Sequence, residues 1–278
     1  MNAQDIAEFQ RRQSKTVLRL YNDNFQNYKR YNIPKAQLVI ADIPYNIGIN
    51  AYASSPEWYV KGDNKNGASR KAGKAFFGTD TNFNIAEYFH FCNRLLKKEP
   101  KEKGKAPCMI VFCSFQQLNT VIEYARRYGF RNYIPLVFCK NYSAQVLKSN
   151  MKIVGATEYG LVLYRDKLPK FRNDGNMVLN WFLWERDGKN IPRIHPTQKP
   201  IKLLKQLISI YTDPGDVVID PCAGSGTTLR AAYELGRSSY GFESVKSFCE
   251  AAWERLLPGA MAYHPAEIAE QTSLFMEG

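Results

Sequence analysis

Hydrophobic positions along the 278-residue chain follow two patterns that alternate. Short runs rich in β-branched and aromatic residues are typical of strands, whereas apolar side chains recurring every three or four positions are typical of helices. The predicted strands are residues 16–21, 37–42, 108–113, 133–139, 158–164, 216–220 and 239–243. The predicted helices are residues 84–96, 116–128, 200–211, 227–235 and 245–256. This alternation predicts an α/β fold.

Two of the predicted strands, at residues 38–40 and 217–219, are continuous apolar runs. Such strands are buried on both faces, which favours a mostly parallel sheet covered by helices. The periodicity fades at about 46–82, 142–157 and 165–195, where polar, aromatic and glycine residues mix. We expect these three segments to be long functional loops inserted in a single domain that spans residues 1–278.

Charge narrows the classes of partner. The chain has 38 Lys and Arg against 26 Asp and Glu, a net charge of +12. This balance favours a polyanion, and nucleic acid before a membrane, because no basic amphipathic helix stands out. A solubilising surface is the alternative.

Cysteine, histidine and hydropathy patterns exclude other classes. The six cysteines form no C-x-x-C pair, and the three histidines are scattered, so reduced thiols and no metal site are predicted. No apolar run approaches the roughly 20 residues that span a bilayer. The first residues lack the apolar core of a signal peptide, which predicts a cytoplasmic protein.

Residues 216–235 form the first segment with recognisable chemistry. An apolar strand ends in Asp220, a Gly224-Ser225-Gly226 turn follows, and Thr227 opens a helix. Glycines allow close approach to a ligand, and the helix start offers unpaired N–H groups. The phosphate-binding P-loop pattern is absent, and Leu229 stands where a dinucleotide fingerprint has its third glycine.

The next strand ends in Glu243, seventeen residues after Gly226. An acid there can accept hydrogen bonds from both hydroxyls of a ribose. A strand, glycine turn, helix, strand and acid suit a nucleoside cofactor without a pyrophosphate, for which S-adenosylmethionine is the candidate. A plain strand–turn–helix corner is the alternative.

The second segment, at residues 38–48, ends a buried strand in a carboxylate. Asp42 is followed by Ile43, which Pro44 restricts to an extended conformation, and then by Tyr45. The Asp42 side chain and the Ile43 carbonyl become two converging acceptors beside an aromatic ring. This arrangement suits the amino group of a nucleobase, although so short a string also occurs in ordinary turns.

Together these segments resemble the amino-methyltransferases that modify DNA at adenine N6 or cytosine N4. The resemblance rests on the base-binding motif at 42–45, H-P-T-Q-K-P at 195–200, the cofactor motif at 220–228, the G-x-E strand at 240–244, the short acidic motif at 20–24 and the hairpin strand at 158–165. The catalytic motif precedes the cofactor motif, which is similar to the permuted order of the family's β class. The resemblance covers about residues 17–256.

The resemblance implies a Rossmann-like methyltransferase sheet, mostly parallel with one antiparallel strand. It implies a DNA methyltransferase that uses S-adenosylmethionine, flips the target base out of double-stranded DNA and methylates the N6 amine of adenine. Cytosine-N4 is the runner-up. Because Ile43 replaces the family's first proline, a catalytically degenerate DNA-binding subunit is a third reading, and an RNA methyltransferase a weaker fourth. A homodimer and a cognate restriction endonuclease stay open as partners.

The resemblance also assigns site residues. The catalytic residues are Asp42, Ile43, Pro44 and Tyr45. The cofactor residues are Asp23, Thr197, Lys199, Asp220, Pro221, Ala223, Gly224, Ser225, Gly226 and Glu243. Asp23 is expected at the cofactor's adenine, Glu243 at its ribose, Asp220 at its methionine ammonium, and the helix start after Lys199 at its carboxylate.

The predicted DNA contacts come from a polar segment, residues 61–74, with five positive charges and one negative charge. Such a segment is too polar to pack, and it follows the strand end that presents Tyr45, so we expect it to close over the DNA backbone. A solvated loop that only adds charge is the alternative. The residues expected to face phosphates are Lys61, Lys65, Arg70, Lys71 and Lys74. The loop at 165–193 is expected to contact the bases.

Overall fold

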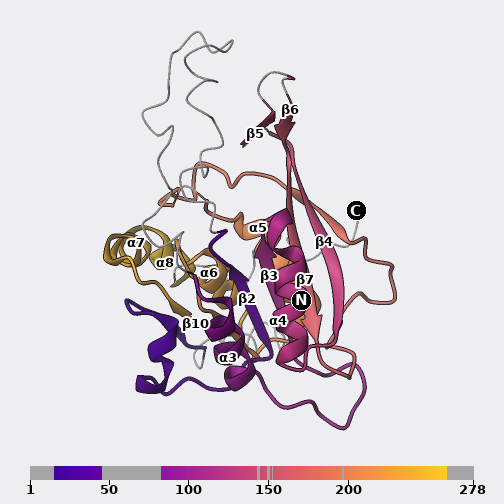
Figure 1. Ribbon diagram of the computed structural model, residues 1–278. Helices are drawn as coiled ribbons and strands as arrows, with labels where there is room; N and C mark the ends of the chain where they lie inside the picture. Colours follow the sequence, from indigo (N-terminus) through magenta and orange to yellow (C-terminus); the bar gives the residue numbers. More distant parts are fainter. Residues whose placement is uncertain are drawn as a thin grey trace.

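The computed structural model describes residues 16–45, 83–142, 145–148, 151, 153–195 and 197–261 (Figure 1). Its strands are β1 (Leu18–Tyr21), β2 (Leu38–Asp42), β3 (Cys108–Cys113), β4 (Asn132–Lys140), β5 (Gln145–Lys148), β6 (Ile153–Gly155), β7 (Thr157–Tyr164), β8 (Trp181–Trp184), β9 (Val217–Asp220) and β10 (Ser238–Phe242). Its α-helices are α3 (Ile85–Leu95), α4 (Leu118–Arg127), α5 (Ile201–Tyr211), α6 (Thr227–Glu234), α7 (Lys246–Ala251) and α8 (Leu257–Met261). Each predicted strand and helix is found, with ends displaced by a few residues.

Eight strands form one sheet in the order β1-β10-β9-β2-β3-β7-β4-β8. Neighbours pair in parallel, except that β7 runs antiparallel to both β3 and β4. The prediction of a mostly parallel sheet with one antiparallel strand is therefore confirmed. Strands β5 and β6 form a separate antiparallel pair, which lies beyond the ends of β4 and β7 (Figure 1).

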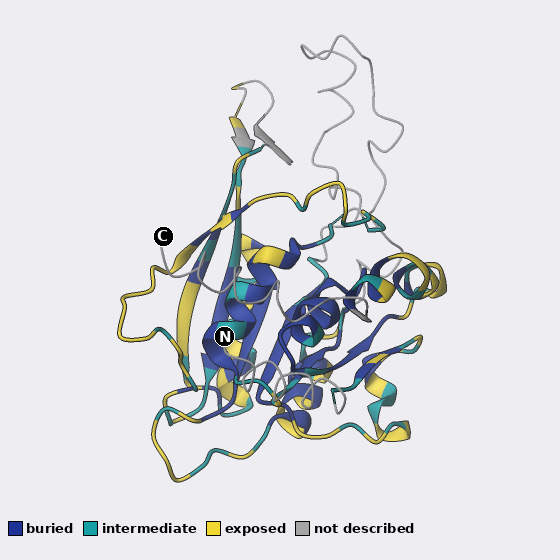
Figure 2. Cartoon of the chain, turned by 180° about the vertical axis from the view of Figure 1, so that it is seen from behind, coloured by how far each residue is buried: buried dark blue, intermediate teal, exposed yellow. Residues whose placement is uncertain are grey.

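The two faces of the sheet bury different side chains, because successive residues of a strand point to opposite sides. In β2, Val39 and Ala41 pack on one face, in the same cluster as side chains of α3 and α4, while Leu38 and Ile40 pack on the other with α5 and α6. The central strands are consequently buried on both faces (Figure 2). This arrangement explains the continuous apolar runs.

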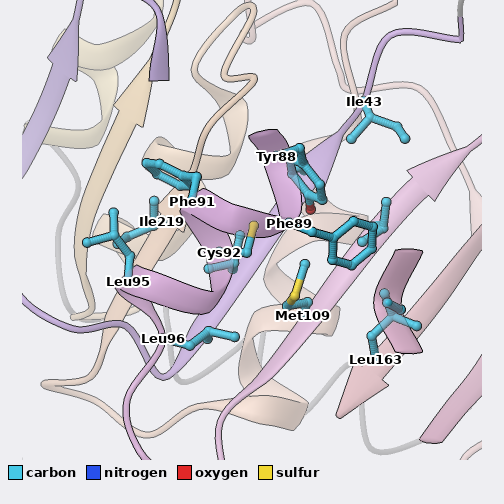
Figure 3. Packing of buried hydrophobic residues seen from close by; sticks show 14 of the residues in the cluster. Ile43, Tyr88, Phe89, Phe91, Cys92, Leu95, Leu96, Met109, Leu163 and Ile219 are labelled. Carbon is cyan, nitrogen blue, oxygen red and sulfur yellow. The ribbon is translucent and has the colours of Figure 1, made fainter. Parts of the chain in front are cut away.

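Helix α3 contributes five buried side chains to the first face. Asn84 caps it by accepting hydrogen bonds from the backbone N–H groups of Ala86 and Glu87, which fixes where the helix begins. Its aromatic side chains Tyr88 and Phe89 are buried, and Ile43 lies in the same cluster (Figure 3). The residue that departs from the family motif is therefore a core side chain.

Three strands lie in segments for which the sequence predicted loops. β8 falls within residues 165–195, and β5 and β6 fall within 142–157. In β8, Phe182 and Trp184 are buried while Trp181 and Leu183 are exposed, so the strand does alternate, but four residues give too short a pattern to recognise. The helix predicted at 245–256 is also corrected, because α7 is followed by a π-helical turn, Ala252–Leu256.

The structure bears on some of the remaining predictions about the loop at 46–82, the domain, the cysteines and membrane spans. Residues 46–82 lie outside the described residues, and the single domain stays a prediction. The six cysteines are free thiols, as predicted. None of the described helices is long and apolar enough to cross a membrane.

Candidate active site

Three predicted acidic residues meet at one edge of the sheet. Asp42 ends β2, Asp220 ends β9, and Glu243 directly follows β10. These strands are parallel neighbours in the order β10-β9-β2, so their carboxyl ends point to the same side. In open α/β sheets this edge is where ligands bind.

Asp220 is a buried carboxyl group whose partners are neutral. Its Oδ1 accepts a hydrogen bond of 2.9 Å from the Cys222 amide, and the Thr228 side chain also donates to it. Burial, together with the charges of Asp42 and Glu243, raises the pKa of Asp220 to about 7. A cationic ligand group would relieve this cost.

Between Asp220 and α6 the chain makes a turn that only glycine adopts readily. Gly224 and Gly226 have φ values of 52° and 79°, and Gly226 is the N-cap of α6. The Gly226 amide bonds to the carbonyl of Ala223 at 2.7 Å, which closes the turn. Because a Cβ at Gly224 would lie 3.6 Å from the His195 ring, that ring packs against the turn. Pro221 and Ser225 occupy the same turn.

Glu243 is held beside this turn by backbone groups. Its Oε1 accepts a hydrogen bond of 2.7 Å from the Val245 amide, and the Gly224 amide also donates to the carboxylate. Burial raises the pKa of Glu243 to about 7. The residue thus offers a nearly buried acceptor next to the glycine turn, as a ribose would require.

Asp42 has one occupied oxygen and one free oxygen. Oδ2 lies 2.5 Å from Nζ of Lys199. Oδ1 is buried, and the described part of the chain supplies it with no hydrogen-bond partner. Burial raises the pKa of Asp42, and the Lys199 charge opposes that rise. A buried acceptor without a donor is costly, and a bound donor would satisfy it.

Glu158 is a site residue that sequence reasoning missed. It lies in β7, and its Oε2 is 3.2 Å from Nζ of Lys199 and accepts a 3.2 Å hydrogen bond from the Tyr45 hydroxyl. Its Oε1 forms an ion pair with Lys140 of β4. The available signal was an acidic residue in an otherwise apolar strand, but nothing in the sequence places it near Asp42.

Aromatic rings surround the two lysines. Nζ of Lys199 lies 5.0 Å from the ring centre of Phe112 and 4.9 Å from that of Trp184. Nζ of Lys140 lies 4.6 Å from the same Trp184 ring. Cation–π contacts of this kind stabilise charges that are removed from water.

A second contact that the sequence did not reveal fixes the base-binding motif. The Gln117 side chain, at the end of the short helix Phe115–Gln117, donates a hydrogen bond of 2.9 Å to the carbonyl of Pro44. The Ile43 amide continues the β2–β3 ladder by bonding to the carbonyl of Phe112 at 3.2 Å. The motif is therefore anchored on both sides of Pro44.

The remaining predicted cofactor residues have other partners. Asp23 accepts hydrogen bonds from Asn24, Asn27 and Tyr31, which lower its pKa. Lys199 contacts Asp42 and Glu158, as described above. Their roles toward a cofactor stay predictions.

The segment before α5 differs from the expected open helix start. The hydroxyl of Thr197 lies 3.1 Å from Nδ1 of His195. The first helical residue is Ile201, one position later than predicted, and its amide donates to Asp187. One of the N–H groups expected to receive a carboxylate is therefore already paired.

The predicted DNA-binding residues cannot be compared with this site. Lys61, Lys65, Arg70, Lys71 and Lys74 lie outside the described residues, so their role stays a prediction. Among the described residues, no group of three or more His, Cys, Asp or Glu side chains is arranged to hold a metal ion.

The chain matches the DNA methylase family model N6_N4_Mtase over residues 36–254. The match includes the predicted catalytic segment, the glycine turn and more than half of the chain, so the chain belongs to this family of DNA methyltransferases. The prediction made from the motifs is confirmed at this level.

Individual relatives agree with the family. DNA adenine methyltransferase YhdJ of Escherichia coli (strain K12) is 27% identical over 289 residues, 93% of this chain and 87% of the relative. The crystal structure of the M1.HpyAVI–SAM complex has a TM-score of 0.61 at 22% identity and covers 86% of this chain and 98% of its own. The cytosine-N4-specific PvuII DNA methyltransferase has a TM-score of 0.58 at 15% identity, covering 95% and 94%. These solved structures share the fold.

Proposed function

We propose that the protein transfers a methyl group from S-adenosylmethionine to the exocyclic N6 amine of an adenine in DNA. The observation that carries this proposal is the buried, unpaired Oδ1 of Asp42 at the ligand-binding edge of the sheet. An amino group of a base supplies the donor that this oxygen lacks. The named relative YhdJ is an adenine methyltransferase, which supports adenine as the base.

The cofactor residues fit S-adenosylmethionine. The carboxyl of Asp220, whose pKa burial raises, suits the methionine ammonium, and Glu243 suits the ribose hydroxyls. The positive φ of Gly224 lets the backbone between these two acids approach a ligand without a side chain in the way. When bound, the cofactor supplies an electrophilic methyl group on a positively charged sulfur.

The chain's own residues prepare the amine. Its lone pair is delocalised into the base, and a hydrogen bond to Asp42 favours the tetrahedral nitrogen that forms during transfer. This bond strengthens as positive charge develops on nitrogen, so it stabilises the transition state more than the ground state. As the new N–C bond forms, the methyl–sulfur bond would break and its electron pair would return to sulfur, which leaves as the neutral thioether S-adenosylhomocysteine, while Asp42 or water accepts the surplus proton from nitrogen. Tyr45 is assigned to stack on the extruded base.

The test is incubation of the protein with methyl-labelled S-adenosylmethionine and double-stranded DNA of varied sequence, followed by digestion and identification of the labelled nucleoside. We expect N6-methyladenine. Asp42→Asn should lower the rate about 10²- to 10³-fold, the usual effect of removing one such contact. Glu123→Gln, which removes an exposed carboxylate of α4 outside the predicted site and DNA-contacting segments, is the control and should retain the parental rate.

Cytosine-N4 methylation is the second candidate, because the cytosine-specific PvuII enzyme shares the fold and a cytosine amine presents the same chemistry. If the labelled nucleoside is N4-methylcytosine, the target base is cytosine and not adenine. Absence of label in every nucleoside, with DNA still bound, would instead support the catalytically degenerate DNA-binding subunit.

A further inference from the structure

Four charged groups of alternating sign form a chain behind the free oxygen of Asp42. Lys199 links the carboxylates of Asp42 and Glu158, at 2.5 Å and 3.2 Å, and Lys140 closes the chain on the far side of Glu158. The four groups come from β2, the segment before α5, β7 and β4. Two negative and two positive charges cancel, so these four groups together carry no net charge.

Glu158 has a second link, to the aromatic residue of the motif. The oxygen that faces Lys199, Oε2, also accepts the 3.2 Å hydrogen bond from the Tyr45 hydroxyl. One carboxylate oxygen therefore connects Asp42, through Lys199, with the ring assigned to the base.

We propose that Glu158 is a positioning residue for methyl transfer. It orients Asp42 indirectly, through Lys199, and it orients Tyr45 directly, through the hydrogen bond from the tyrosine hydroxyl. This inference rests on the proposed function, because it assigns Asp42 and Tyr45 to the target base. Held at Oδ2 by Lys199, Asp42 presents Oδ1 to the amine.

Structural neutralisation alone does not require this arrangement. Asp42 would already balance Lys199, and the additional pair of Glu158 and Lys140 adds no net charge. A buried ion pair contributes little stability compared with apolar residues of the same volume. The extra pair does gain a geometric function, because it fixes Lys199 and Tyr45 from one side.

The same groups act on the proton affinity of Asp42 in opposite directions. Burial is the largest cause of its raised pKa, Glu158 raises the pKa further, and Lys199 lowers it. Among the described residues, Lys140 also lowers the pKa of Asp42, and the Asp42 charge in turn raises the pKa of a further set of groups, Tyr45, Cys113, Asp220 and Cys222. Removing the charge of Glu158 should consequently lower the pKa of Asp42, and removing the charge of Lys199 should raise it.

The test measures single-turnover methyl transfer against pH, with cofactor and DNA saturating. In Glu158→Gln we expect the acidic limb of the pH–rate profile to move down by about one pH unit, because the variant loses a negative charge close to Asp42. The rate on the plateau should fall about 10- to 100-fold through lost orientation, with little change in the KM for DNA. A merely structural role for Glu158 would lower the rate without moving the limb.

Changes to the lysines give the opposite shift. Lys199→Met should move the acidic limb up, and Lys199→Arg should restore it. Lys140→Met, whose charge also lowers the pKa of Asp42, should give a smaller upward shift and serves if Lys199→Met does not fold. Glu123→Gln, in an exposed ion pair of α4, is the matched control for Glu158→Gln and should leave rate and limb unchanged.

A measurement without turnover separates this inference from the proposed function. In protein labelled with carbon-13 at aspartate carboxyls, the Asp42 signal is the one lost in Asp42→Asn. The pH midpoint at which this Asp42 signal titrates should fall in Glu158→Gln and rise in Lys140→Met. A midpoint that moves neither way overturns the inference, as does one that moves while the limb of an active enzyme stays fixed. If the Asp42 midpoint moves in the variants as expected but the wild-type protein transfers no methyl group, the proposed function is overturned instead.

Discussion

Replacing Asp220 with asparagine is expected to stabilise the folded protein at alkaline pH while weakening its affinity for S-adenosylmethionine. The Asp220 side chain lies at the end of β9 and is 3% exposed. Its pKa rises from 3.8 to about 7 because burial disfavours the charged form. Asparagine keeps the shape and an acceptor for the Cys222 amide but carries no charge.

The magnitude follows from the pKa difference between the two states. Below about pH 4 the carboxyl is protonated in both the folded and the unfolded chain, so it costs nothing. Between about pH 4 and 7 the unfolded chain releases a proton that the folded chain keeps, and the free energy of unfolding falls as pH rises. Above about pH 7 the cost is complete, at about 4 kcal/mol for three pKa units. Asparagine avoids it.

Urea unfolding, followed by circular dichroism at pH 5 and pH 8, measures this difference. Asp220→Asn should gain about 2–3 kcal/mol more at pH 8 than at pH 5. Asp166→Asn, whose carboxylate is 67% exposed, should gain nothing at either pH. Calorimetry should show a 10- to 100-fold loss of cofactor affinity in Asp220→Asn, the usual cost of losing a bond to a charged group. A gain in stability equal at both pH values would refute the buried-charge reasoning, and unchanged affinity would remove Asp220 from the cofactor site.

Three further outcomes are expected. Glu243→Ala should weaken S-adenosylmethionine binding by about 2 kcal/mol in calorimetry, and parental affinity would exclude it from the ribose site. Ile43→Pro should lower the free energy of unfolding by about 1–2 kcal/mol, because it loses a backbone hydrogen bond and buried volume; a gain measured in urea would contradict this. Neutralising Arg70, Lys71 and Lys74 together should flatten the slope of log DNA affinity against log salt by roughly 0.9 per lost phosphate contact, and an unchanged slope would place the basic contacts elsewhere.

The loss of stability expected for Ile43→Pro follows from contacts of Ile43 that only the structure shows. From the sequence, restoring the family's proline should preserve or improve activity, provided that the Ile43 amide is dispensable. The structure shows that this amide bonds to the carbonyl of Phe112, and that the Ile43 side chain is 1% exposed. The isoleucine is therefore part of the strand pairing and of the core, which a comparison of motifs does not reveal.

Much of the sheet could be predicted from the sequence because its strands have distinct local patterns. Residues 38–42 and 217–220 are apolar runs that end in an acid, and the glycine turn marks where the second run meets its helix. Acids that end parallel strands lie at one edge, so the proximity of Asp42, Asp220 and Glu243 follows from local patterns and chain direction.

The rest of the site could not be predicted because it depends on which distant strands become neighbours. Glu158 reaches Lys199 only because β7 inserts between β3 and β4. The family resemblance assigns Lys199 to the cofactor, and the pairing of Lys199 with Asp42, 157 residues away, has no local signal in the sequence. Trp184 lies in a strand of four residues, too short for a periodic pattern.

The pairing of strands that lie more than 170 residues apart in the sequence has a consequence for synthesis on the ribosome. β1 pairs with β10, joining Leu18 to Ser239, and β2 pairs with β9, joining Leu38 to Val218. At roughly 5–20 residues per second, the partner of β1 is translated roughly 10–40 s after β1 itself. Until then the first strands have unpaired edges, which can associate with other nascent chains. Half of the sheet can therefore close only after β9 and β10 have been translated, so the yield of folded protein should depend on chaperones that protect the first strands during that interval.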